Sequence, residues 1–211
     1  METRVKKTSN TKTLLIEAAA ELFMRQSYGA VSVDDIAIAA GIKKGTFYHH
    51  FSSKADLALA AYEHMWEDGK KVLDACFSPT VPAEKRLEKY TEAMYQCHVE
   101  DFEIEGKIYG CPLCSAGAEM SAQDDRIRQR LKDIYDGHCA YYASVLRDLP
   151  QLDGISRAEI EKLSREMFSY TGGVLNNAKV ANDPEVIRRD LLPGLSRFLI
   201  PQPSGRKKAK A

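Results

Sequence analysis

Apolar residues recur at helical spacing along almost the whole chain of 211 residues. After residue 123, one face of a long segment holds Ile127, Leu131, Ile134, His138, Tyr142, Val145 and Leu149. Positions three and four apart lie on one side of an α-helix, so such a set marks a packed helical face. No segment has the strict alternation that indicates a half-buried β-strand. The spacing therefore predicts an all-α chain of about nine helices.

Glycines, prolines and capping residues predict where these helices end. Gly41 stops a short apolar helix, and Ser32 followed by Asp35 is close to a capping box at its start. Pro79 and Pro82 interrupt the chain between two longer helices. The first predicted helix ends near residue 28. The other predicted helices cover 33–40, 44–51, 53–75, 82–100, 112–120, 123–149, 160–182 and 185–198.

The composition is that of a globular protein, with 28% charged and 44% hydrophobic residues. No apolar run approaches the ~20 residues of a membrane helix, and the first residues lack an apolar signal core. Five cysteines without an export signal favour free thiols in a reducing compartment. We therefore expect a cytoplasmic protein that does not contact membranes and carries no cofactor.

The formal net charge of zero hides an uneven distribution. Residues 1–12 carry a net +3, and residues 202–211 carry +4 with no acidic residue. The middle of the chain therefore carries −7. Basic ends can contact a polyanion that an acidic body would repel, although short basic tails also serve solubility alone.

The stretch "GIKKGTFYHHF", residues 41–51, lies in the third of three short helices near the start of the chain. Two short helices joined by a tight turn are the layout of a helix-turn-helix, and the second helix would enter the DNA major groove. Lys44, Gly45 and Thr46 occupy its first turn, where small and cationic groups suit DNA. Phe47 and Phe51 are four residues apart and are expected to face inward.

Tyr48 and His49 follow on the side expected to be exposed, and Lys54 begins the next helix. The adjacent His49 and His50 also suggest a metal site. Side chains of neighbouring helical residues diverge by about 100°, however, whereas metal-binding pairs lie three or four apart. The stretch therefore predicts DNA binding and no metal.

The segment from Glu21 to Ala60, "ELFMRQSYGAVSVDDIAIAAGIKKGTFYHHFSSKADLALA", resembles the TetR/AcrR family of bacterial transcriptional regulators. The resemblance implies a homodimer that binds a palindromic double-stranded DNA operator, usually as a repressor. It also implies a helix-turn-helix domain over 1–53 with a basic N-terminal arm. An effector-binding and dimerisation domain would cover 54–201, and 202–211 would be a basic disordered tail.

Roles for individual residues follow from the same resemblance. Lys44, Thr46 and His49 would contact bases or adjacent phosphates, with Gly45 allowing close approach. The residues expected to anchor phosphates are Ser32, Tyr48 and Lys54. Packing between helices is the alternative for Tyr48, and plain surface charge is the alternative for Lys54.

Cys111 and Cys114 lie in "YGCPLCSAGAEMS", residues 109–121, after an irregular segment. This stretch resembles a branch of the family that includes acrylate- and electrophile-responsive repressors, although Cys114 departs from its pattern. The pair could sense reactive compounds through its thiols, form half of a zinc site, or simply pack as small buried residues. A thioredoxin-like oxidoreductase is the alternative function, but its βαβ unit is absent from the pattern.

The effector is not named by the sequence, but polar or aromatic residues on apolar helical faces are candidates for its pocket. They are His138, Tyr95, His98, Trp66 and Phe168. A lone histidine on such a face is more often a core residue than a ligand-binding one.

The last two helices are expected to form the dimer. Gly172 and Gly173 allow close approach, and Ile187, Leu191, Leu195 and Phe198 form an apolar stripe that could instead serve the chain's own core. We expect a regulator and no enzyme.

Overall fold

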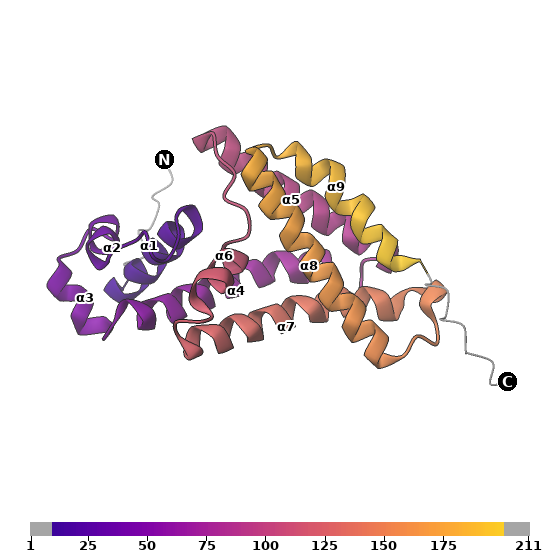
Figure 1. Cartoon of the computed structure of the whole chain (residues 1–211), viewed down its shortest axis with the longest axis horizontal. Coiled ribbons are helices and arrows are strands. Elements are labelled where there is room, and N and C mark those ends of the chain that lie inside the picture. Colours follow the sequence, from indigo (N-terminus) through magenta and orange to yellow (C-terminus); the bar gives the residue numbers. More distant parts are fainter. Residues whose placement is uncertain (1–9, 201–211) are drawn as a thin grey trace, which may run out of the picture. The chain divides into compact units, whose positions relative to one another are not determined.

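The computed structural model describes residues 10–200 and contains nine α-helices and two short 3₁₀ segments in that range (Figure 1). The helices are α1 Thr11–Arg25, α2 Val33–Ala39, α3 Lys44–His50, α4 Lys54–Cys76, α5 Ala83–Glu105, α6 Pro112–Met120, α7 Asp125–Asp148, α8 Arg157–Ala181 and α9 Glu185–Ser196, with 3₁₀ segments η1 Pro150–Leu152 and η2 Arg197–Leu199. The described residues include no strand. The all-α prediction is therefore confirmed.

Two helix ends and one helix start differ from the prediction. Helix α8 begins at Arg157 and not at residue 160, because Ser156 caps it. Helix α1 ends at Arg25 and not near residue 28, because Gln26 is already extended. Helix α5 continues to Glu105 and not only to residue 100, because no glycine or proline interrupts it before Gly106. Gly106 has a left-handed φ of 69°, and its N–H donates to the Phe102 carbonyl, which ends the helix as a glycine C-cap does.

The chain forms two compact units. The first unit comprises Met1–Val72 and Tyr109–Asp136, and the second comprises Leu73–Ile108 and Gly137–Ala211. The functional division predicted at residue 53 stays a prediction. Residues 1–9 of the predicted basic arm and the predicted tail at 202–211 lie outside the described residues.

The core of the first unit joins the three short N-terminal helices to α6 and to the start of α7. Its fully buried side chains include Leu15, Ile36, Phe47, Leu57 and Ile127. From α6, the contributing residues are Leu113, Ala116 and Met120. Because a close-packed core transmits displacement, α6 and the N-terminal helices form one mechanical body.

The second unit packs α8 and α9 side by side, with α5 also against α9 (Figure 1). Of the predicted dimer stripe, Ile187, Leu191 and Leu195 are no more than 1% exposed within the single chain. The stripe therefore belongs to the chain's own core, as the alternative interpretation predicts. These three residues are not available to a partner subunit. A Cβ at Gly194 would lie 2.0 Å from the Tyr170 ring, so this α9 position requires glycine.

Candidate nucleic-acid interface and thiol site

Helix α2 begins with a complete capping box, as the spacing of Ser32 and Asp35 predicts. The Asp35 N–H donates to Ser32 Oγ at 3.1 Å, and the Ser32 N–H donates to Asp35 Oδ2 at 2.8 Å. The hydrogen bonds from Ser32 hold the pKa of the Asp35 carboxyl below its usual value. Aspartate thus serves as well as the more common glutamate at this position, and it fixes the start of α2.

A tight turn connects α2 to α3. Gly41 has a φ of 68°, a left-handed conformation that favours glycine, and the Ile42 N–H donates to the Ala37 carbonyl at 2.9 Å. Helix α3 is held by Phe47, which is fully buried, and by Phe51, whose ring centroid lies 6.1 Å from that of Phe47. Both phenylalanines face inward, as predicted.

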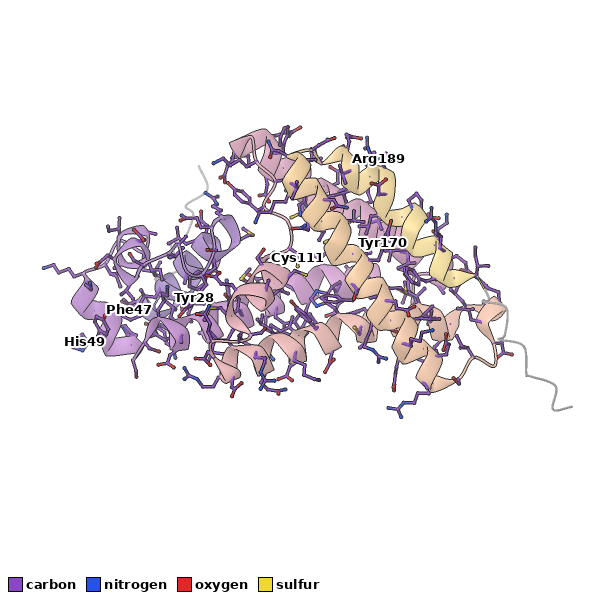
Figure 2. The ribbon with its side chains drawn as sticks, viewed as in Figure 1. Tyr28, Phe47, His49, Cys111, Tyr170 and Arg189 are labelled. Atoms are coloured by element: carbon purple, nitrogen blue, oxygen red, sulfur yellow. The ribbon has the colours of Figure 1, made fainter. Side chains whose placement is uncertain are left out.

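The other side of α3 faces solvent. Lys44, Gly45 and His49 are exposed, and Tyr48 is 56% exposed although its ring also contacts the edge of Phe47. Figure 2 shows His49 at the outer side of α3. Among the described residues, a Cβ on Gly45 would meet no atom within 4 Å outside its own helix backbone and its chain neighbours, and Thr46 is half-buried. The arrangement leaves the first turn of α3 free to approach a flat or grooved surface.

Lys44 is already paired in the free protein. Its Nζ lies 2.8 Å from Asp34 Oδ2 in α2, and this hydrogen bond raises the pKa of the lysine. Both side chains are more than half exposed, so a phosphate could compete for the ammonium. The sequence carries no signal for this pair, because its partners lie ten residues apart on different helices.

Lys54 has an internal role in addition to any contact with DNA. Its Nζ donates to the carbonyls of Tyr28 and Val31, each at 2.9 Å, and lies 4.0 Å from the centre of the Tyr28 ring. Partial burial lowers the pKa of the lysine. Lys54 therefore fastens α4 to the turn before α2, and its predicted role as a phosphate anchor stays a prediction.

Cys111 is the N-cap of α6, and Pro112 occupies its first turn, which is where the helix predicted over 112–120 begins. The Cys114 N–H donates to Cys111 Sγ at 3.5 Å, and the Ser115 hydroxyl donates to the Cys111 carbonyl at 3.2 Å. Tyr135 from α7 donates its hydroxyl to the Leu113 carbonyl at 2.9 Å. The two thiols therefore lie together at a helix start that is closed on one side by a tyrosine.

The environment separates the acidities of the two thiols. A hydrogen bond from the Cys114 thiol, supported by backbone N–H groups of Cys114 and Leu113, lowers the pKa of Cys111 to about 7 against the opposing effect of burial. The same thiol–thiol hydrogen bond, together with burial, raises the pKa of Cys114. Cys111 is thus the more acidic thiol of the pair, and Cys114 is the hydrogen-bond donor.

Within the first unit, α6 also holds the turn between α1 and α2. The Gly29 N–H donates to Glu119 Oε1 at 2.6 Å, across 90 residues of sequence. A Cβ on Gly29 would lie 2.5 Å from that oxygen, so only glycine permits the approach. Sequence reasoning missed Glu119, since only the folded chain brings it to residue 29.

The other predicted effector residues fall into separate places. His138 and Phe168 meet with ring centroids 5.5 Å apart in the second unit, and Trp66 packs against the core of the first. In α5, the Tyr95 hydroxyl donates to Glu185 Oε1 at 2.5 Å, and the Arg188 guanidinium lies 4.1 Å from the centre of the Tyr95 ring. His98, also in α5, is buried, with Nδ1 2.7 Å from the Met94 carbonyl. A shared pocket for these residues stays a prediction.

Two properties of the described residues 10–200 bear on other classes of site. They contain no group of three or more His, Cys, Asp or Glu side chains placed to hold a metal ion. None of their helices combines the length and apolar character needed to span a bilayer.

Family models match both parts of the chain. The model of bacterial regulatory proteins of the tetR family matches residues 15–61, and that of the tetracyclin repressor-like C-terminal domain matches residues 83–191. The first match contains α2, α3 and the turn between them. The second contains α6 and the thiol pair.

Several characterised proteins and solved structures are similar. Transcriptional regulator AcuR from Cereibacter sphaeroides is 34% identical over 174 residues, which is 81% of this chain and 77% of AcuR. HTH-type transcriptional repressor DhaR from Mycobacterium sp. strain GP1 is 27% identical over 58% of each chain. The crystal structure of regulatory protein TetR from Rhodobacter sphaeroides aligns with a TM-score of 0.77 at 26% identity, covering 90% of this chain and 99% of that one. These comparisons give the alternative of a thiol–disulfide oxidoreductase no support.

Proposed function

Since the chain belongs to the TetR family of DNA-binding transcriptional regulators, we propose that it is a repressor that leaves its operator when Cys111 is modified. A repressor of this kind acts in the cytoplasm, where bacterial DNA lies. The observation that carries the DNA-binding part is the two-sided helix α3, anchored inward by Phe47 and open outward from Lys44 to His49.

The proposed DNA contacts are those that the family implies, and the exposure of Lys44, Gly45, Tyr48 and His49 supports them. Lys44, Thr46 and His49 read bases or adjacent phosphates in the major groove, while Gly45 lets the backbone approach. Ser32, Tyr48 and Lys54 anchor phosphates at the groove's edge. The Tyr48 hydroxyl suits this role because more than half of the side chain is exposed.

The regulator is dimeric, as is typical of its family. Because the α9 stripe is used inside the chain, we assign the partner contact to the exposed face of α8. That face holds Ser169, Gly173, Asn176, Asn177 and Val180. Among residues 10–200, a Cβ built on Gly173 would meet no atom within 4 Å outside the backbone of its own helix and its chain neighbours, so the position has room for a partner helix. Two-fold pairing would place two α3 helices on half-sites about one DNA turn, ~34 Å, apart.

The proposed effector is a soft electrophile or an oxidant. With an activated alkene, the Cys111 sulfur pair forms a C–S bond while the π pair moves to the neighbouring carbon, which takes a proton from water. With hydrogen peroxide, Cys111 becomes a sulfenic acid as one water forms, and the Cys114 thiol then closes a disulfide with loss of a second water. Both steps begin from the thiolate that the α6 start stabilises.

The route from Cys111 to DNA lies within the first unit. Modification removes the Cys111 N-cap and disturbs the first turn of α6. Leu113, Ala116 and Met120 of that helix share a core with Phe47. Glu119 at its other end holds Gly29, so a shift of α6 reaches the turn before α2.

Binding to the DNA upstream of the protein's own gene tests the proposed function. Fluorescence anisotropy with a labelled fragment is expected to show saturable binding that survives excess unrelated DNA and weakens steeply with salt. Binding that unrelated DNA competes away equally well would contradict an operator-specific regulator. A thiol–disulfide oxidoreductase would show no binding.

A further inference from the structure

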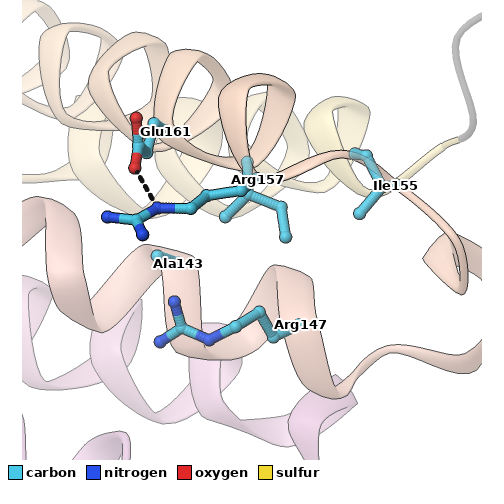
Figure 3. Close-up of a pocket in the computed structure, with 6 residues that line it drawn as sticks. Ala143, Arg147, Ile155, Arg157 and Glu161 are labelled. Atoms are coloured by element: carbon cyan, nitrogen blue, oxygen red, sulfur yellow. Dashed lines mark hydrogen bonds and ion pairs between the residues drawn. The ribbon is translucent and has the colours of Figure 1, made fainter.

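A shallow cavity lies in the second unit between the last turns of α7 and the first turns of α8 (Figure 3). Its volume is about 470 Å³, within the range of small-molecule sites. The lining residues are Ala143, Arg147, Ile155, Arg157, Ile160 and Glu161. None of the residues assigned above to DNA or to the thiol site lines this cavity.

The cavity has a cationic end and an apolar end. In Figure 3, the guanidinium groups of Arg147 and Arg157 extend to the same side from two facing helices, and Ile155 lies at the opposite end. Ala143 and Ile160, each 7% exposed, add apolar surface to the lining. A ligand that fills the space would need both a polar head and an apolar part.

The charges at the polar end do not cancel. Arg157 Nε lies 2.7 Å from Glu161 Oε1, which neutralises one guanidinium but leaves its two terminal nitrogens available. No ion pair with Arg147 is found among residues 10–200. The neighbouring carboxylate of Asp148 is already paired, at 2.6 Å, with the buried Arg86. One positive charge at the cavity therefore lacks a protein counter-ion.

We propose that this cavity binds a small organic anion with a carboxylate or phosphate head and a short apolar chain. The planar guanidinium forks of Arg147 and Arg157 hold such a head through charge-assisted hydrogen bonds. The chain lies on Ala143, Ile155 and Ile160, where burying apolar surface adds affinity. Glu161, which pairs with the largely exposed Arg157, disfavours a second negative charge.

Calorimetric titration of the full-length protein tests this site with four probes: octanoate, octyl phosphate, octanol and inorganic phosphate. Octanoate or octyl phosphate is expected to bind with one site per chain, and the tighter of the two identifies the preferred head. Octanol and inorganic phosphate each lack half of the recognised chemistry and are expected to bind at least about tenfold more weakly.

Arg147→Gln is the primary variant, because this exposed side chain can change without disturbing the core. It is expected to weaken binding of the preferred anion by about tenfold, and Arg147→Gln with Arg157→Gln by more. Arg165→Gln removes an exposed α8 arginine outside the cavity and is the control expected to bind as the wild type does. Circular dichroism verifies that all variants are folded.

Three outcomes would overturn the proposal. The first is that neither amphipathic anion binds the wild type. The second is that the double variant binds the anion as tightly as Arg165→Gln does, which would place the ligand elsewhere. The third is that no anion binds while the double variant sediments as a monomer, which would assign the arginines to a partner's carboxylates. The first two outcomes leave operator binding by α3 unaffected, and in the third the wild-type protein still binds its operator, so each is distinguishable from failure of the proposed function.

Discussion

The starts of α3 and α6 both present backbone N–H groups, but the start of α3 is exposed and that of α6 is enclosed. At α3, Lys43 is the N-cap, no side chain of the described residues caps the helix, and the first turn is exposed. At α6, the Cys111 sulfur caps the helix beside a buried Leu113. Both starts favour negative charge, because unpaired N–H groups carry partial positive charge. Solvent access to the helix start therefore determines which anion it can stabilise. The exposed start of α3 is open to a phosphate from outside, whereas the enclosed start of α6 stabilises the protein's own thiolate.

The largest effect is expected from detaching α3. Phe47→Ala removes a fully buried ring and should lower the free energy of unfolding by about 3–5 kcal/mol. Tyr48→Ala, at the exposed neighbour, should change it far less. Urea denaturation followed by circular dichroism measures both. Equal losses would mean that α3 is not held by its inward face.

The second prediction concerns DNA binding by the exposed start of α3. Lys44→Ala combined with Thr46→Ala should weaken operator binding by roughly 10-fold to 100-fold, because contacts to bases and charged contacts to phosphates are lost. Circular dichroism should be unchanged. Arg128→Ala, on the exposed side of α7, is the matched control for loss of one positive charge. If the double variant bound the operator as tightly as the wild type does, the start of α3 would not be part of the DNA interface.

The third prediction concerns how the reactivity of Cys111, at the enclosed start of α6, depends on pH. Since the pKa of Cys111 is lowered to about 7, its alkylation by iodoacetamide should rise with pH and level off above that value. Near neutral pH it should react about tenfold faster than Cys76, Cys97 and Cys114, whose pKa values are all raised. Mass spectrometry of peptides follows each site. If the alkylation rate of Cys111 instead keeps rising with pH well above 7, as it does for an ordinary thiol, then Cys111 and Cys114 are only buried packing residues.

The smallest effect tests the pre-existing pair at α3. Asp34→Asn frees Lys44 and removes a negative charge beside the DNA, so operator affinity should increase by about twofold to fivefold. The increase should shrink at high salt, where the exposed pair is screened. Asp125→Asn, an exposed α7 carboxylate, serves as the control. Weaker binding by Asp34→Asn would show that the pair orders Lys44 for DNA.

Local patterns allowed most of the fold to be predicted. Gly41, the Ser32–Asp35 box and Pro112 each act within one turn of chain, so their consequences could be read from the sequence. The outward side of α3 followed from the two inward phenylalanines. These features depend on neighbours three or four residues away, which the sequence displays directly.

Long-range pairs could not be predicted in this way. Glu119 reaches Gly29 across 90 residues, and Lys54 turns towards the carbonyls of Tyr28 and Val31. The α9 stripe was ambiguous for the same reason, since periodicity marks a buried face without saying whether the covering helix belongs to the same chain. Only packing resolved it in favour of the chain's own core.

Release of a preformed operator complex by N-ethylmaleimide tests most directly whether the two helix starts are coupled. The anisotropy of labelled operator is recorded before and after the reagent is added to wild type and to Cys111→Ser. The wild-type complex is expected to dissociate at the rate of Cys111 alkylation, and the Cys111→Ser complex is expected to persist. A wild-type complex that stays intact after Cys111 is fully alkylated would contradict the coupling.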